Sequence, residues 1–346
     1  MKTRAAVLIS PDRPLELANL RIPALRPGQV LVRMAYAGVC QTQLLEARGH
    51  RGDDPFLPHC LGHEGTGTVV ETSSASNGFA AGDPVVLSWM KGRGADVPGT
   101  QYDWNGRTVN AGGVTTFGEL MVVSENRLTP APEGLSMRDA ALLGCAIPTG
   151  FGAVLNTANL RPGETLAVFG AGGVGLCAII AGQLAGADPI VAIDVRADRL
   201  AAAEMLGATD IIDSSKVDDL KSSLVDICGP VDVAIEATGV PDVMTLALAS
   251  VAPRGGRAVV VGNAHHGNSV QIDPWHLNQG KSLLGTWGGD NDPPVDFPRY
   301  SRLIRSRNVD MSPISSPDYA LEDLNQALRD LETGATVRPI IRIGQP

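Results

Sequence analysis

The chain has 346 residues, of which 44% are hydrophobic and 19% charged, and its formal net charge is −9. Its length exceeds the roughly 250–300 residues that a single hydrophobic core usually serves, so the sequence predicts two domains. The negative charge argues against binding to nucleic acid or to an anionic membrane, and no apolar run reaches the ~18 residues of a membrane span.

The N-terminal segment and the cysteines indicate the compartment. Residues 1–10 contain too short an apolar stretch for a signal peptide, and they read as a first strand. The five cysteines are scattered, odd in number and without a C-x-x-C spacing. This pattern is typical of reduced thiols rather than of a disulfide framework, so we expect a cytoplasmic protein.

Residues 1 to about 145 are rich in short β-like runs separated by glycine and proline, such as 29–36, 67–71 and 83–87. Such spacing predicts a twisted antiparallel barrel or sandwich. Within this region, residues 91–113 are rich in Gly, Asp and Asn and show little periodicity. We expect them to form a long surface lobe, which is either functional or a solvated insertion.

Two cysteines and a histidine of this region are candidate metal ligands. Cys40, His63 and Cys145 offer two thiolates and an imidazole, a set that suits a zinc ion with an open fourth position. Each residue also has a simpler interpretation, because free cysteines are often buried in cores and a lone histidine is often structural. Their spacing alone identifies no zinc site.

Between about residues 147 and 287 the pattern changes to alternating strands and helices. A β-like run at 165–169 precedes the motif Gly170-Ala-Gly-Gly-Val-Gly175, and an apolar helix-like segment follows it. The next apolar run, 189–193, ends at Asp194. Strand, glycine turn, helix, strand and acid together form the dinucleotide-binding fingerprint.

Each glycine of the motif has its own expected task. Gly170 permits the tight turn, Gly172 lets the backbone approach a pyrophosphate, and Gly175 lets helix and strand pack closely. The helix N-terminus supplies N–H groups for the phosphates. Asp194 would accept the ribose hydroxyls and repel a 2′-phosphate, which favours NAD over NADP, although Arg196 and Arg199 stand near enough to tolerate a phosphate.

The rest of the chain extends this alternation. Further helices and strands are expected at 196–206, 231–235, 242–251 and 257–261. They predict an α/β fold with a doubly wound parallel sheet. The last part holds an amphipathic helix at 321–332 and a strand at 337–342, which we expect to return to the first domain.

Several independent motifs, in order along the whole chain, resemble those of the zinc-dependent medium-chain dehydrogenase/reductase (alcohol dehydrogenase) family. Besides the glycine motif they are Gly38-Val-Cys40 with Thr42, Gly62-His-Glu64, Phe79 with Gly82-Asp-Pro-Val85, Cys145 with Thr149-Gly150, and Arg338. The resemblance implies a Rossmann domain joined to a β-rich GroES-like catalytic domain. It implies domain bounds of 1–146 with 288–346 for the catalytic domain and 147–287 for the dinucleotide-binding domain.

The resemblance also implies roles for single residues. Cys40, His63 and Cys145 would bind one catalytic zinc per chain. Glu64 would lie close to the metal, and Thr42 would hydrogen-bond the alcohol and begin the proton path. The expected cofactor-binding residues are Thr149, Gly170, Gly172, Gly173, Val174, Gly175, Asp194, Arg199, Thr238, Val261 and Arg338.

The chain departs from the family pattern at four places. Gln41 stands where a basic residue often meets the pyrophosphate. The four cysteines that hold a structural zinc in the lobe near residues 90–110 are missing, so we expect no second zinc. Gln43 stands where an acid usually anchors the zinc-binding histidine. Leu45 stands where a histidine commonly relays protons; His50 and His59 are the alternatives, although each is more typical of a surface or packing histidine.

These features together predict an NAD-dependent zinc alcohol dehydrogenase that acts on a primary or secondary alcohol, polar alcohols included, and gives an aldehyde or ketone. Two alternatives stay open: a zinc-independent NAD(P)H-dependent reductase of an activated double bond, and a non-catalytic dinucleotide-binding protein. The expected partner is a small alcohol or carbonyl substrate. The resemblance further implies a homodimer or homotetramer.

Overall fold

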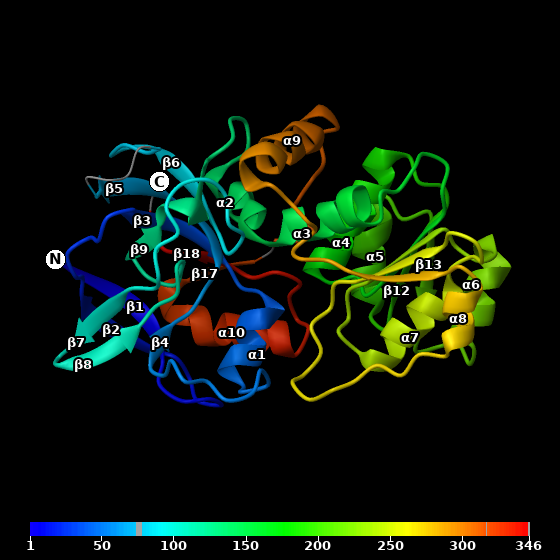
Figure 1. Cartoon of the computed structure of the whole chain (residues 1–346), viewed down its shortest axis with the longest axis horizontal. Helices are drawn as coiled ribbons and strands as arrows, with labels where there is room; N and C mark the ends of the chain where they lie inside the picture. Colours follow the sequence, from blue (N-terminus) through cyan, green and yellow to red (C-terminus); the bar gives the residue numbers. More distant parts are fainter. Residues whose placement is uncertain (74–77, 316, 345–346) are drawn as a thin grey trace. The chain divides into compact units, whose positions relative to one another are not determined.

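The computed structural model describes residues 1–73, 78–315 and 317–344. Backbone contacts divide the chain into two compact units, which Figure 1 colours along the sequence. Unit 1 consists of Met1–Cys145 and Asp292–Pro346, and unit 2 is the continuous stretch Ala146–Asn291. Among the described residues no single helix is long and apolar enough to span a membrane, and only one bent helix pair passes that test when its members are taken together.

Unit 1 contains a closed barrel and a second sheet. The barrel has the strand order β1-β2-β7-β8-β4. The second sheet has the order β10-β6-β5-β3-β18-β17, and β9 also pairs with β3. The strands are β1 (Lys2–Leu8), β2 (Glu16–Arg21), β3 (Gln29–Gly38), β4 (His59–Cys60), β5 (Glu64–Thr72), β6 (Pro84–Ser88), β7 (Gln101–Trp104), β8 (Arg107–Asn110), β9 (Leu120–Ser124), β10 (Leu128–Pro130), β17 (Asp318–Ala320) and β18 (Ile340–Arg342).

The helices of unit 1 are short, apart from α9 and α10. They are α1 (Gln41–Ala47), η1 (Glu125–Arg127), α2 (Met137–Ala140), η2 (Ala141–Gly144), α9 (Pro293–Ser306), η4 (Leu321–Asp323) and α10 (Leu324–Glu332). The apolar side chains of α10, such as Leu324 and Leu328, pack in one cluster with Leu44 of α1. Burial of one apolar face against the sheet and α1 explains the amphipathic pattern of this helix.

The last strand of the chain lies inside the second sheet. β18 pairs with β3 on one side and with β17 on the other. Ile340 and Ile341 are fully buried. The C-terminal segment is therefore an integral part of unit 1.

Residues 91–113, which were expected to form a long surface lobe, contain two short strands. β7 and β8 form an antiparallel hairpin, and both strands belong to the barrel. The hairpin turns at Asn105 and Gly106, which both have positive φ values (52° and 89°). Asn-Gly is the dipeptide that a type I′ hairpin turn favours, because both residues must adopt φ > 0. Tyr102 is 1% exposed, and its hydroxyl accepts a hydrogen bond from the Val122 N–H at 2.8 Å.

Unit 2 is a six-stranded parallel sheet with the order β13-β12-β11-β14-β15-β16. Its strands are β11 (Leu166–Phe169), β12 (Ile190–Asp194), β13 (Asp210–Asp213), β14 (Val233–Glu236), β15 (Arg257–Val260) and β16 (Ser282–Gly285). Its helices are α3 (Ala146–Gly152), continued by η3 (Ala153–Thr157), and α4 (Gly173–Ala185), α5 (Ala197–Met205), α6 (Leu220–Cys228), α7 (Pro241–Ser250) and α8 (Pro274–Asn278). Figure 1 shows α4 and α7 on opposite sides of the strands.

The central strands of this sheet are buried on both faces, which explains why their sequences are continuous apolar runs. Every residue of β11, β12 and β14 is buried. A parallel sheet covered by helices on two sides requires this composition. The fold is therefore the α/β arrangement that the alternation predicted.

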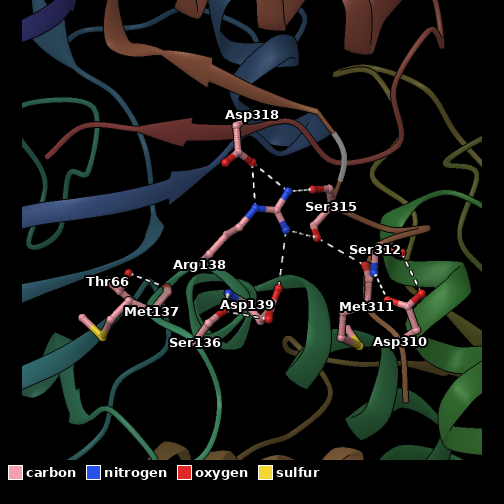
Figure 2. Close-up of polar contacts among 10 residues, drawn as sticks. All are labelled: Thr66, Ser136, Met137, Arg138, Asp139, Asp310, Met311, Ser312, Ser315 and Asp318. Carbon is pink, nitrogen blue, oxygen red and sulfur yellow. Dashed lines mark hydrogen bonds and ion pairs between the residues drawn. The ribbon is translucent and has the colours of Figure 1, made fainter. Parts of the chain in front are cut away.

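A guanidinium group fastens two distant segments of unit 1 to each other (Figure 2). Arg138 of α2 donates hydrogen bonds to the Asp318 carboxylate at 2.7 Å, to Ser315 Oγ at 2.8 Å and to the Ser315 carbonyl oxygen. On the other side of α2, Thr66 Oγ1 donates to the Met137 carbonyl at 2.7 Å. The short helix that leads toward Cys145 is thus held by β5 on one side and by Ser315 and Asp318, the latter at the start of β17, on the other.

Candidate metal centre

Cys40, His63 and Cys145 come from three separate points of unit 1 and converge. Cys40 is the N-cap of α1, just after β3; His63 directly precedes β5; and Cys145 directly follows η2. β3 and β5 are antiparallel, with Ala37 opposite Gly65, so the end of β3 lies beside the start of β5. One ligand atom from each of the three residues lies within 4.8 Å of the other two.

Gly144 lets the third ligand approach the first two. A Cβ at this position would overlap the Leu87 carbonyl oxygen and the Glu64 side chain. The Gly144 carbonyl also accepts a hydrogen bond from Ser88 Oγ at 2.7 Å. The backbone before Cys145 therefore packs directly on β5 and β6, and this contact is possible only for glycine.

The donor set fits a zinc ion. Both cysteines are 6% exposed and carry free thiols. His63 Nε2 is buried and makes no hydrogen bond to any described residue. A buried ring nitrogen without a partner is costly unless something else binds it. Two sulfurs and one imidazole nitrogen are ligands that zinc prefers, and three protein ligands leave a fourth position for an exchangeable group.

The two thiols are strongly coupled. The hydrogen bond between the sulfurs holds the pKa of Cys40 well below its usual value, against the effect of burial and with help from the positive charge of Arg338. The same hydrogen bond, together with burial, raises the pKa of Cys145 well above its usual value. Both sulfurs must be deprotonated to bind a metal ion, so metal binding at this pair is coupled to proton release.

Gln43 contacts two of the three ligand residues. It is 1% exposed, and its Oε1 accepts a hydrogen bond from the Cys40 backbone N–H at 2.8 Å. Its Nε2 contacts His63 Nδ1. The neutral amide thus occupies the place where the family pattern has an acid, and it keeps the contact with the histidine ring.

Glu64 and Arg338 form a buried ion pair beside the thiols. Glu64 Oε1 lies 2.5 Å from Arg338 Nη2, and the two side chains are 0% and 4% exposed. Burial alone would lower the pKa of Arg338, but the negative charges of Cys40, Glu64 and Cys145 raise it well above its usual value. A Cβ at Gly38 would overlap the Glu64 carboxylate, so the glycine at the end of β3 makes room for this pair.

Thr42 lies close to the first ligand, in the first turn of α1. Cys40 Sγ lies 3.7 Å from Thr42 Oγ1, within hydrogen-bonding distance for a sulfur. Its hydroxyl thus lies beside a sulfur of the donor cluster, on a side chain that is half-buried.

A cavity of about 1010 Å³ in unit 1 reaches Gln43 and His63. Its walls include the acidic side chains Glu46, Asp53 and Asp54, the basic side chains Arg26 and Arg51, and His59. His59 makes contacts through both ring nitrogens, to Asp54 Oδ2 at 2.7 Å and to the Cys60 carbonyl at 3.0 Å. These two contacts favour the packing interpretation of His59 over a role as a proton relay. His50 is exposed.

The glycine motif of unit 2 has the backbone that the fingerprint requires. Gly170 has a φ of +93°, a conformation that side-chain-bearing residues rarely adopt. Gly172 has open space where a Cβ would stand, and a Cβ at Gly175 would overlap the Gly170 carbonyl oxygen. α4 begins at Gly173 without a side-chain cap. Its first N–H groups are therefore available to an anion.

Asp194 lies at the end of β12 and holds the glycine turn. Its Oδ2 accepts a hydrogen bond from the Ala171 N–H at 2.8 Å, and its Oδ1 accepts one from the Arg196 N–H at 3.0 Å. The side chain is 7% exposed. Each carboxylate oxygen has a further lone pair, so these bonds leave capacity for a ribose hydroxyl.

Glu236 is a structural residue of this region that the sequence did not single out. It is fully buried at the end of β14, where Oε1 accepts hydrogen bonds from the Thr238 N–H (2.6 Å), the Thr238 hydroxyl (2.5 Å) and the Gly239 N–H (2.9 Å). Its carbonyl oxygen accepts from the Val261 N–H at 2.8 Å. This buried acid thus holds Thr238 and Val261, two of the expected cofactor-binding residues, in place. The available signal was an acid directly after an apolar strand.

The remaining expected cofactor-binding residues lie on three helices of unit 2 and in unit 1. Thr149 is on α3, with a buried hydroxyl that makes no hydrogen bond to the described residues. Val174 is in the first turn of α4, and Arg199 is on α5, just after Asp194. Arg338 belongs to unit 1, where it pairs with Glu64.

Family models match both parts of the chain. Residues 26–133 match the alcohol dehydrogenase GroES-like domain. Residues 173–306 match the zinc-binding dehydrogenase model.

Whole proteins and solved structures are similar along the full chain. An S-(hydroxymethyl)glutathione dehydrogenase from Escherichia coli O1:K1 / APEC is 31% identical, with 99% of this chain and 100% of that protein covered. The crystal structure of an alcohol dehydrogenase zinc-binding domain protein from Burkholderia ambifaria has a TM-score of 0.91 at 31% identity, with 100% of both chains covered. Benzyl alcohol dehydrogenase from Acinetobacter calcoaceticus has a TM-score of 0.89 at 29% identity, with 99% of this chain and 100% of that one covered.

Proposed function

The chain belongs to the zinc-dependent medium-chain alcohol dehydrogenase family, and from this premise we propose which of its residues carry out the reaction. The protein is an oxidoreductase that interconverts alcohols and carbonyl compounds and uses zinc and a nicotinamide dinucleotide. We assign the zinc to Cys40, His63 and Cys145. The observation that carries this assignment is the convergence of their ligand atoms to within 4.8 Å of one another.

In the proposed reaction, the side chains of the protein position the alcohol and carry its proton away. Zinc, when bound, acts as a Lewis acid that lowers the pKa of an alcohol and polarises a carbonyl group. We assign to Thr42 the task of taking the alcohol proton and passing it toward solvent, which its hydroxyl beside Cys40 Sγ supports. Glu64 and Arg338 keep charge balanced around the thiolates, since one carboxylate and one guanidinium are buried there together.

We propose that residues 1–146 with 288–346 serve as the catalytic domain and residues 147–287 as the dinucleotide-binding domain. The nicotinamide cofactor carries the hydride in this class of reaction. Its expected contacts are Thr149, Gly170, Gly172, Gly173, Val174, Gly175, Asp194, Arg199, Thr238, Val261 and Arg338. The open backbone at Gly172 and the uncapped start of α4 support binding of the pyrophosphate.

We propose NAD rather than NADP as the dinucleotide. Asp194 supports this choice, because a buried carboxylate at the end of the second strand repels a 2′-phosphate and can accept ribose hydroxyls. The guanidinium of Arg196 forms an ion pair with Asp198 at 3.0 Å, so that arginine is already engaged. Comparison of initial rates with the two dinucleotides tests this, and a preference for NADP would contradict it.

For the substrate we propose a primary or secondary alcohol, with polar alcohols included. The cavity that reaches His63 supports a polar substrate, because acidic and basic side chains line it. A panel that contains S-(hydroxymethyl)glutathione, benzyl alcohol, linear alcohols and polyols would rank these classes by kcat/KM. A preference for linear apolar alcohols would contradict a polar substrate.

The decisive experiment combines metal analysis with an activity assay. We expect one equivalent of zinc per chain and NAD reduction with at least one alcohol. Cys40→Ser should lose both, whereas Cys228→Ser, a half-buried cysteine outside the donor cluster, should keep both. Turnover of an activated double bond without zinc would indicate the reductase alternative. Dinucleotide binding without turnover would indicate a non-catalytic protein.

Two further proposals concern the assembly and the compartment. We propose a homodimer or homotetramer, supported by β16, which is the last strand of its sheet, and by the exposed Trp275 and Trp287 near it in the sequence. Light scattering that gave a monomer would contradict this. We propose a cytoplasmic location, supported by five cysteines that are all free thiols.

A further inference from the structure

The side chain of Gln43 touches two zinc-ligand residues with opposite ends of one amide group. Oε1 accepts from the Cys40 backbone N–H at 2.8 Å, and Nε2 meets His63 Nδ1. Gln43 is 1% exposed, so water does not substitute freely for either contact. The hydrogen-bonding pattern around this amide therefore determines which nitrogen of the histidine ring carries the proton.

The chemistry of the contacts fixes the orientation of the amide. A backbone N–H can only donate, so the amide oxygen must face Cys40. The amide NH2 group then faces His63 Nδ1, which must accept. A neutral imidazole has one N–H, so its proton is on Nε2 in this arrangement.

A metal ion on His63 requires the other tautomer. Nε2 is the ring nitrogen that is buried and without a hydrogen bond, and Nδ1 is held by Gln43. When Nε2 binds a metal, the ring proton is on Nδ1, which then donates to a neighbour. The amide oxygen of Gln43 would still accept from the Cys40 N–H, but the His63 Nδ1–H would then face the amide NH2 group. Both of these groups are donors, so they cannot form a hydrogen bond. A carboxylate in the same place would accept both.

We propose that Gln43 is a positioning residue that weakens the hold of this site on zinc, because its amide satisfies Nδ1 of His63 in the metal-free tautomer and gives up that hydrogen bond when zinc binds. This inference rests on the proposed zinc site. The glutamine thus makes the metal more exchangeable than a carboxylate would.

The test compares zinc affinity in Gln43→Glu and Gln41→Glu. Both variants replace an amide by a carboxylate of the same shape on α1, but Gln41 is exposed and outside the donor cluster. Zinc affinity is measured by competition with a chromogenic chelator after metal removal. We expect Gln43→Glu to bind zinc about 10–100-fold more tightly than the wild type, which is the usual effect of a residue that supports a metal ligand. Gln41→Glu should stay close to the wild type, because solvent screens its charge.

Two results would overturn the proposal. One is a Gln43→Glu variant that binds zinc no more tightly than the wild type. The other is an equal gain in Gln41→Glu, since that would indicate a general effect of charge. A protein with no zinc affinity at all would instead contradict the zinc site itself, so the two failures are distinguishable.

A second measurement needs no variant. ¹⁵N NMR of the wild type, labelled at its six histidines, reports which ring nitrogen of His63 carries the proton; the His63 signal is assigned by its loss in His63→Gln. We expect the proton on Nε2 in the metal-free protein and on Nδ1 after zinc is added. A proton on Nδ1 in the metal-free protein would refute the proposed conflict even if Gln43→Glu failed to fold.

Discussion

Arg138→Ala should lower the free energy of unfolding of unit 1 by about 2–4 kcal/mol. The guanidinium loses a bond of 2.7 Å to Asp318 and a bond of 2.8 Å to Ser315 Oγ, and the Arg138 side chain is only 26% exposed. The carboxylate bond is partly exposed and contributes about 1 kcal/mol. Ser315 is fully buried, so its carbonyl and hydroxyl groups lose their donor at a cost of about 1–3 kcal/mol.

Urea unfolding followed by circular dichroism measures this change directly. Thermal melting gives a second measure of the same change. For a unit of about 150–250 residues, each kcal/mol lowers the melting temperature by roughly 2–4 °C, so the melting temperature should fall by roughly 4–16 °C. Arg21→Ala is the matched control, because Arg21 makes one ion pair at 3.4 Å with side chains that are 70% and 39% exposed. That variant should change stability by less than about 1 kcal/mol.

Arg138→Lys separates charge from shape. Lysine keeps the positive charge but lacks the planar fork that reaches Asp318 and Ser315 together. It should recover less than half of the lost stability. An Arg138→Ala variant within about 0.5 kcal/mol of the wild type, or no more affected than Arg21→Ala, would refute the reasoning, since surface substitutions without such contacts usually stay in that range.

Three further predictions concern the surroundings of the donor cluster. Arg338→Met should destabilise the protein by about 3–5 kcal/mol in urea unfolding, because it leaves the fully buried Glu64 carboxylate without a countercharge; a stability equal to that of the wild type would contradict a charged Glu64. Gly38→Ala should cost about 1–3 kcal/mol and reduce the zinc content, because the added Cβ overlaps Glu64, whereas Gly285→Ala, which meets nothing within 4 Å, should be near neutral in thermal melting. Burial raises the pKa of Glu46; its folded-state pKa thus exceeds the unfolded value of about 4.3, and the stability that the acid contributes is lost as pH rises through the folded pKa. The stability of the wild type relative to Glu46→Gln should therefore fall with rising pH in a denaturation series, and an increase would contradict the raised pKa.

The α/β part of the fold follows closely from the sequence. The runs at 165–169 and 189–193 overlap β11 and β12 because strands buried on both faces must be apolar throughout. The glycine motif adds a turn with few alternatives, since Gly170 needs a positive φ. Local composition therefore carries most of the information about unit 2.

Unit 1 was harder to predict because its barrel is built from short strands that pair with distant partners. β7 and β8 are four residues each and lie in a polar stretch, where alternation is too short to detect. Asn105-Gly106 is the local signal for the hairpin, but the surrounding residues are also rich in Gly, Asp and Asn, so the dipeptide does not stand out in the sequence.

The donor cluster could be named from the family resemblance but not from spacing. Cys40, His63 and Cys145 meet because β3 and β5 are antiparallel and because Gly144 packs on β5, and both facts depend on the tertiary fold. The double contact of Gln43 likewise could not be predicted from sequence, since it depends on where His63 lies relative to α1.

The position of β18 has a consequence for folding during synthesis on the ribosome. Unit 2 is a continuous stretch and can fold as soon as it emerges, whereas unit 1 begins before it and is completed after it. β18 lies between β3 and β17 and pairs with residues 36–38 of β3, so this end of β3 stays unpaired on that side until residues 340–342 have been made. Nascent unit 1 therefore keeps a short unpaired strand edge throughout the synthesis of unit 2, and an unpaired edge can pair with other chains.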